Sequence, residues 1–180
     1  MARCAGKDET NNASPGRDNF TLMQSILTLL RSLHLYALAA HHEVRGDSFN
    51  SDHEFLGALY QEYLDDFDHI VEMCKADQLT INELESAQEA ARKVLNTSLN
   101  SPFLVLKTWE RELLDLLERE NKLSHSLSLQ AAIQSLAERN GKRRYKLGQR
   151  ASASTQRRGL DTHSSTAPTD NVDVLYHKAC

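Results

Sequence analysis

The sequence predicts an all-α protein, and three observations support this fold class. The chain has 180 residues, of which 40% are hydrophobic, so a single compact core can form. It contains only 7 glycines, 3 prolines and 6% aromatic residues, which disfavours a β-sandwich or a β-barrel. Apolar residues recur at intervals of three and four over several long segments, which is the period of an amphipathic helix.

Charge and cysteine content narrow the class of protein further. The 21 basic and 25 acidic residues give a net charge of −4, which excludes a globally basic, histone-like protein but allows a local basic patch. No apolar run approaches the ~20 residues of a membrane span, and the N-terminal segment lacks the apolar stretch of a signal peptide. Cys4, Cys74 and Cys180 are widely spaced, unlike a disulfide framework or a metal motif. We therefore expect a soluble cytoplasmic protein.

Composition divides the chain into three parts. Residues 1–17 are polar and are interrupted by Pro15 and Gly16, so we expect a disordered N-terminal arm. Residues 150–180 are rich in Ser, Thr, Ala and Asp without helical periodicity, so we expect a disordered C-terminal tail. The helical domain is then predicted to span 18–149.

Local signals place the starts of the helices. A Ser or Thr followed three residues later by Glu or Gln has the spacing of a capping box, which closes the first turn of a helix. Such pairs are Thr21–Gln24, Ser51–Glu54 and Thr80–Glu83. Ser101-Pro102 places proline at the first helical position, and Ser126 or Ser128 can begin the last helix. The predicted helices span about 18–45, 51–75, 80–95, 102–117 and 126–149.

Each predicted helix carries an apolar stripe that a core would bury. In the first helix the stripe consists of Leu22, Ile26, Leu29, Leu30, Leu33, Tyr36 and Ala37. The short third helix has Leu84, Ala87, Ala91 and Leu95, the fourth has Leu106, Trp109, Leu113, Leu114 and Leu117, and the fifth has Leu129, Ile133, Leu136 and Ala137. Four long helices and a short one predict a helical bundle.

The second helix places polar residues where its apolar stripe should be. On a wheel of 100° per residue, His53 and Asp68 lie within or at the edge of the apolar arc, and Glu72 lies just beyond it. Asp65, Asp66 and His69 point toward the expected solvent face. Because burying an uncompensated polar group is costly, His53 and Asp68 should have a polar partner or a metal ion.

Geometry predicts that these residues meet between two chains. His53 and Asp68 are 15 residues apart, about 22 Å along a helix, so they cannot share a site within one chain. His41, near the end of the first helix, can reach His53 across the short loop. A two-fold, antiparallel pairing of second helices would bring Asp68 and Glu72 of one chain to these histidines of the other. Two imidazoles with two carboxylates suit iron, manganese or zinc.

The segment from 41 to 72 resembles the Dps family, the ferritin-like proteins that protect DNA during starvation. That family has a histidine at the end of the first helix, a basic-Gly-x-x-Phe turn, a second histidine, and an Asp-x-x-x-Glu pair on the second helix. The matching residues, in one ungapped register, are His41, Arg45-Gly46, Phe49, His53, Asp68 and Glu72.

Two positions depart from the family pattern. Dps proteins carry an aspartate four residues after the second histidine, where this chain has Gly57. Some phage-encoded ferritin-like sequences are similar in having Leu-Gly at this place. The tryptophan that usually follows the first histidine is replaced by His42. The first departure removes one carboxylate ligand from the site that the resemblance implies.

The resemblance implies a ferritin-like four-helix bundle with a short extra helix between the second and third long helices. It implies an iron site at which His41, His53, Asp68 and Glu72 bind Fe(II) and support its oxidation by peroxide or oxygen, although other divalent metals suit the same ligands. It also implies a homo-oligomer built from two-fold dimers, usually a hollow dodecamer, which sequesters iron and protects DNA. The alternative is a non-enzymatic assembly or DNA-compacting protein that has lost ferroxidase activity, a reading that Gly57 favours.

A basic segment could contact DNA without reading its sequence. Residues 139–158 carry eight basic side chains and no acidic one, in a chain that is acidic overall. The candidate DNA contacts are Arg143, Arg144, Lys146, Arg150, Arg157 and Arg158. The alternative is a solvated helix end, whose cations are favoured by the helix dipole, followed by a soluble tail.

Overall fold

The computed structural model describes residues 15–123 and 125–161, and the regular structure within these ranges is entirely helical. The all-α fold class is therefore confirmed. The five helices are α1 (Pro15–Glu43), α2 (Phe49–Ala76), α3 (Glu83–Leu95), α4 (Pro102–Glu120) and α5 (Leu127–Asp161).

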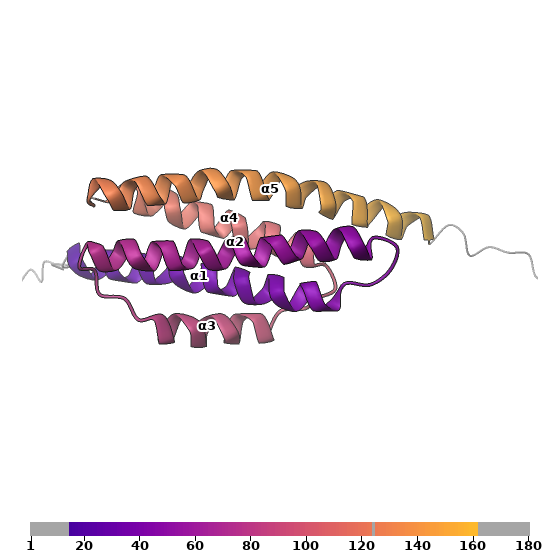
Figure 1. Ribbon diagram of the computed structural model, residues 1–180, viewed down its shortest axis with the longest axis horizontal. Coiled ribbons are helices and arrows are strands. Elements are labelled where there is room, and N and C mark those ends of the chain that lie inside the picture. The colour runs from indigo at the N-terminus through magenta and orange to yellow at the C-terminus, as the bar shows by residue number, and fades with distance from the viewer. Residues whose placement is uncertain (1–14, 124, 162–180) are drawn as a thin grey trace, which may run out of the picture.

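The four long helices lie side by side along one axis, and α3 lies outside them against α1 (Figure 1). Helix α1 packs against α2 and α4, and α5 packs against α4 and α2, so the order around the bundle is α2, α1, α4, α5. Short loops join α1 to α2 and α4 to α5. The long connection from α2 to α4 contains α3 and runs the length of the bundle, so α4 begins at the end opposite to the last turn of α2 (Figure 1).

The core is formed by the apolar stripes predicted for the four long helices. The stripe predicted for the short helix was wrong, because Leu84 and Leu95 are 79% and 85% exposed and α3 buries Ser86 and Ala90 instead. Leu33 and Tyr36 of α1, Leu56 of α2, Leu113 of α4 and Leu136 of α5 are all completely buried. Burial raises the pKa of Tyr36 to about 12, and its hydroxyl donates a hydrogen bond of 2.7 Å to the carbonyl oxygen of Ser98. This bond links the connection between α3 and α4 to α1.

Helix α1 is more apolar than the sequence pattern led us to expect. By length and composition alone, its segment Leu22–Glu43 is long and apolar enough to cross a membrane, and 56% of the apolar window is buried inside the bundle. Its contacts with α2, α3 and α4 account for this composition, because a helix packed on three sides must be apolar around most of its circumference.

Several helix ends differ from the prediction. Helix α1 begins at Pro15, and α2 begins at Phe49 after the N-cap residue Ser48, so the residues at 21 and 51 lie inside helices. The side chain of Asn82, not Thr80, caps α3 by accepting a hydrogen bond of 3.1 Å from the backbone N–H of Glu85. Asparagine is among the best N-cap residues, which explains the shift. The start of α4 at Ser101-Pro102 is confirmed.

The last helix extends well beyond the predicted domain boundary at 149. Helix α5 continues to Asp161, through a segment whose composition we interpreted as disordered. Extending an existing helix costs much less than starting one, so weak helix formers can follow a well-packed segment. Residues 1–14 and 162–180, which include most of the predicted arm and tail, lie outside the described residues.

Candidate functional site

His41 and His53 form a close pair within a single chain. His41 lies in the last turn of α1 and His53 in the second turn of α2, and the short loop between the helices brings the two rings to a centroid separation of 3.7 Å. The rings are tilted by 34°, and both side chains are half-buried. The expectation that His41 reaches His53 is therefore met.

A hydrogen bond defines which nitrogen of His41 carries a proton. Its Nδ1 lies 2.8 Å from the carbonyl oxygen of His53. Because a carbonyl oxygen can only accept, Nδ1 must be the donor, and in the neutral ring Nε2 keeps its lone pair. His34 makes the equivalent bond, 3.0 Å from Nδ1 to the carbonyl oxygen of Tyr60, and is 9% exposed. His34 is thus a satisfied interior histidine.

The acidic candidates lie elsewhere on α2. Asp68 and Glu72 are both exposed and are one helical turn apart, so they share a face. The wheel prediction was wrong for Asp68, which is not part of the core, and for Asp66, which is only 4% exposed. The buried face of α2 is centred on Leu59, Tyr63 and Ile70, because α2 packs between α1 and α5.

One chain does not assemble a complete metal site. Among the residues that the structure describes, no group of three or more His, Cys, Asp or Glu side chains is placed to hold a metal ion. Each chain offers a pair of imidazoles in one place and a pair of exposed carboxylates in another. Ligation by all four residues therefore requires a second chain.

A buried ionic cluster lies inside the bundle, and the sequence reasoning missed it. The guanidinium of Arg143 donates to Asp66 at 2.7 Å and to Glu110 at 2.5 Å, while Arg139 donates to Asp66 at 2.7 Å. Asn140 donates to the side chain and the backbone carbonyl of Glu110. The cluster joins α2, α4 and α5 across the core.

Burial and the neighbouring charges act in opposite directions on the pKa values of this cluster. Burial raises the pKa of Glu110, although the nearby guanidinium of Arg143 lowers it in part. Burial alone would lower the pKa of Arg143, but the carboxylates of Glu110 and Asp66 raise it overall. Arg143 also lies over the ring of Tyr63, with 4.8 Å between its central carbon and the ring centroid.

A sequence signal for this cluster exists. Asp66 is three residues after Tyr63 and four before Ile70, Glu110 falls between Leu106 and Leu113, and Arg143 is four residues before Leu147. Each charge thus occupies a core register of its own helix. Acidic residues on two apolar stripes and a basic residue on a third indicate a buried ion cluster.

Some of the basic side chains in residues 139–158 form ion pairs within the chain. Arg143 is 1% exposed, so it is not available to DNA, and its inclusion among the DNA contacts was wrong. Arg150 pairs with Asp52 and lies over the ring of Phe55, 4.2 Å from its centroid. Lys146 is exposed and Arg144 is half-buried. The side chains of Arg157 and Arg158 lie outside the described residues.

A buried contact between Glu120 and His125 closes the turn between α4 and α5. Nε2 of His125 lies 2.9 Å from a carboxylate oxygen of Glu120, and these side chains are 3% and 0% exposed. Burial raises the pKa of Glu120, and His125 offsets this only in part. The nearby thiol of Cys74 is completely buried, which raises its pKa to about 12. Such a thiol is inert at neutral pH.

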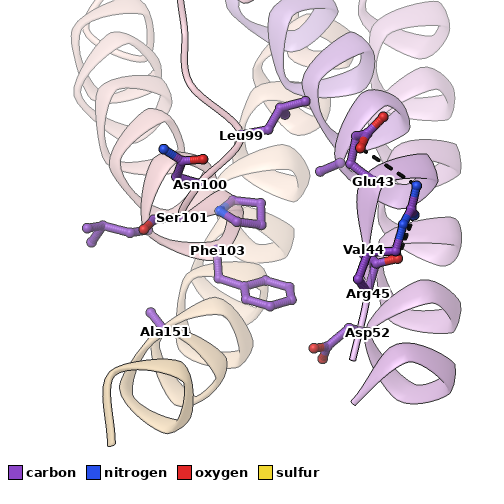
Figure 2. A pocket seen from close by; sticks show the side chains of 12 residues that line it. Glu43, Val44, Arg45, Asp52, Leu99, Asn100, Ser101, Phe103 and Ala151 are labelled. Carbon is purple, nitrogen blue, oxygen red and sulfur yellow. Dashed lines mark hydrogen bonds and ion pairs between the residues drawn. The ribbon is translucent and has the colours of Figure 1, made fainter. Parts of the chain in front are cut away.

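A pocket of about 400 Å³ lies at the end of the bundle where α1 joins α2 (Figure 2). Its walls come from the end of α1, the following loop, the start of α4 and Ala151 of α5. The ring of Phe103 faces this space, and Arg45 pairs with Glu43 at 3.8 Å beside it (Figure 2). The pocket is lined by neither His41 nor His53, so it is separate from the candidate metal ligands.

Comparisons of the chain with protein-family models, with curated proteins and with solved structures gave no match. Function is therefore inferred from the residues and their geometry.

Proposed function

We propose that the protein is a Dps-like, iron-binding and iron-oxidising protein whose metal site is shared by two chains. One observation carries the proposal. His41 and His53 are paired at a ring separation of 3.7 Å at one end of α2, while Asp68 and Glu72 are exposed together farther along the same helix. A two-fold axis across α2 would bring the histidines of each chain to the acids of the other.

The helix order supports the ferritin-like part of the proposal. Ferritin-like folds are four-helix bundles with one long crossover connection. Here the connection from α2 to α4 is the long one, and it carries the short helix α3 along the side of α1. The two remaining connections between long helices are short, which places α1 beside α2 and α4 beside α5.

The donor atoms fit Fe(II) as a substrate. Nε2 of His41 has a lone pair because Nδ1 is engaged by the His53 carbonyl, and bonds of this kind orient metal-ligating histidines in proteins. Asp68 and Glu72 of the second chain would supply anionic oxygens that favour the ferric product. In the proposed reaction each Fe(II) gives up one electron, and a peroxide takes two electrons and two protons to become two water molecules.

The experiment that tests this function is oxidation of Fe(II) by added hydrogen peroxide and, separately, by air, each followed by the absorbance of the ferric product. We expect the wild-type protein to accelerate oxidation and His53→Ala to abolish the acceleration. His69→Ala is the matched control, because His69 is an exposed histidine on the same helix. Equal rates for the wild type and His53→Ala would exclude ferroxidase activity at this site and leave the non-enzymatic assembly protein, which Gly57 favours.

A second candidate function, contact with DNA, is supported by the exposed basic side chains of α5. We propose that Lys142 and Lys146, both exposed, contact phosphates together with Arg144. The double substitution Lys142→Glu with Lys146→Glu should weaken DNA retardation at low salt, whereas Lys122→Glu, in the loop after α4, should not. Unchanged retardation in the double variant would remove α5 from the DNA-binding proposal.

A further inference from the structure

Gly57 faces the ring of His41 across the interface between α1 and α2. A Cβ atom built on Gly57 would lie 3.2 Å from Cε1 and 3.4 Å from Nδ1 of His41. The first distance is tighter than nine in ten Cβ contacts in proteins, so the ring would have to move by a few tenths of an ångström. Glycine is also unfavourable inside a helix compared with alanine, which calls for a specific reason for its presence here.

The ring of His41 has little freedom to move away. Its Nδ1 donates to the His53 carbonyl at 2.8 Å, and one of its faces lies on the His53 ring. The ring of Tyr60 packs edge-on at a centroid distance of 5.6 Å, and that of His42 lies at 5.2 Å. A shift of a few tenths of an ångström would lengthen the hydrogen bond and change the stacking geometry.

We propose that Gly57 is a positioning residue. Because it has no side chain, the ring of His41 has room to stack on His53, with Nδ1 protonated and Nε2 available to a metal. The absence of a carboxylate at this position then has a steric function, because any side chain at 57 displaces the histidine. The availability of Nε2 to a metal rests on the proposed function, whereas the position of the His41 ring does not.

Gly141 provides a matched control within the same molecule. It also lies inside a helix, but a Cβ atom built there has no neighbour within 4 Å. Gly141→Ala should therefore raise the midpoint of urea unfolding, as expected for alanine replacing glycine in a helix. Gly57→Ala should gain nothing or lose stability, because the contact with His41 opposes the helical preference.

The direct test is the ¹⁵N NMR spectrum of the histidine side chains without metal. In the wild type the His41 signals should show a protonated Nδ1, and Gly57→Ala should shift them toward a mixture of tautomers. Gly141→Ala should leave them unchanged. A folded Gly57→Ala protein with wild-type His41 signals would overturn the proposal.

A double-mutant cycle keeps the test decisive if Gly57→Ala unfolds the protein. In a His41→Ala background the obstructing ring is gone, so Gly57→Ala should be tolerated as well as Gly141→Ala. The same loss of stability in both backgrounds, or failure of the double variant to fold, would show that the glycine serves some purpose other than accommodating the ring.

Measuring Co²⁺ binding distinguishes the role of Gly57 from the existence of the proposed metal site. With Co²⁺ as an oxidation-resistant probe, Gly57→Ala should bind about 10- to 100-fold more weakly than the wild type, the usual effect of disturbing the orientation of a ligand. If the wild type binds no Co²⁺, the proposed function fails while the NMR result still decides the role of Gly57. Undiminished Co²⁺ affinity in Gly57→Ala would refute its role in presenting His41 to a metal.

Discussion

At the scale of single residues, the bundle buries several charged side chains as completely as its apolar ones. Asp66, Glu110 and Arg143 are each at most 4% exposed, and all three are joined by hydrogen bonds. A buried charge without its partner is strongly destabilising. The complete set of ion pairs contributes less to the free energy of unfolding than its short distances suggest. The cluster therefore links α2, α4 and α5 through charges that depend on one another.

Removing Arg143 should expose this dependence. Arg143→Ala leaves two buried carboxylates without their main cation, so we expect a loss of about 3–5 kcal/mol in the free energy of unfolding. Urea denaturation measures this loss. The neighbouring substitution Arg144→Ala is the control and should change stability by less than about 0.5 kcal/mol. A similarly small effect of Arg143→Ala would contradict the structural role of the cluster.

The Glu120–His125 pair should produce a pH-dependent effect on stability. Burial raises the folded-state pKa of Glu120 above the ordinary value of 4.5, so the folded protein holds this proton more tightly than the unfolded chain does. The associated stability is present below pH 4.5 and is lost as the pH rises through the raised pKa.

Glu120→Gln removes this titration. The free energy of unfolding of the variant, relative to the wild type, should therefore increase from about pH 4.5 upward and then level off. The exposed Glu118→Gln, on the same helix, should show no such trend. A difference between Glu120→Gln and the wild type that is constant with pH would show that burial of Glu120 does not shift its pKa.

At the scale of the elements, the sequence predicted the number and order of the helices but not all of their ends. The three-and-four periodicity of the four long helices corresponds to burial in the structure, whereas the apolar stripe predicted for α3 ends in the exposed Leu84 and Leu95. The starts are harder to predict, because several Ser, Thr and Asn residues compete for each cap. The side chains of Asn82 and Ser126 accept hydrogen bonds from the first turns of α3 and α5, whereas those of Ser48 and Ser101 make no such bond. Ser101-Pro102 was unambiguous, because proline cannot lie deeper in the helix without losing a backbone bond.

Helix α3 offers a test of such a local bond. Its N-cap residue Asn82 accepts from the backbone N–H of Glu85, and its own backbone also bonds with Gln24 of α1 at both N–H and carbonyl. Asn82→Ala should cost about 1 kcal/mol through loss of the cap and should increase amide hydrogen exchange in α3. Thr80→Ala should have a smaller effect. A larger loss of stability in Thr80→Ala than in Asn82→Ala would instead support a helix start at Thr80.

The candidate ligands also show what periodicity can and cannot provide. The pairing of His41 with His53 could be predicted, because a short loop between antiparallel helices leaves few places for either ring. The exposure of Asp68 could not, because the orientation of α2 depends on its packing against α1 and α5, and the contact with α5 includes the unforeseen ion pair of Asp66 with Arg143. Gly57 attracted notice only as a missing carboxylate, and its contact with His41 required coordinates.

At the scale of the whole molecule, the arrangement of the candidate ligands makes assembly a condition of the proposed iron chemistry. His53 and the acidic pair lie on the one continuous helix α2, and His41 of α1 is stacked on His53, so the two pairs cannot meet within one chain. The proposed two-fold pairing is consequently the claim on which iron chemistry depends, and it predicts that each site draws its ligands from both chains.

Complementation between two inactive chains measures this most directly. One chain carries His41→Ala with His53→Ala, the other carries Asp68→Asn with Glu72→Gln, and each alone should fail to oxidise Fe(II). Coexpressed in equal amounts, random pairing leaves about one site in four with a complete ligand set, so about a quarter of the wild-type rate should return. No recovery, in mixed oligomers whose assembly is verified by mass spectrometry, would contradict a site shared between two chains.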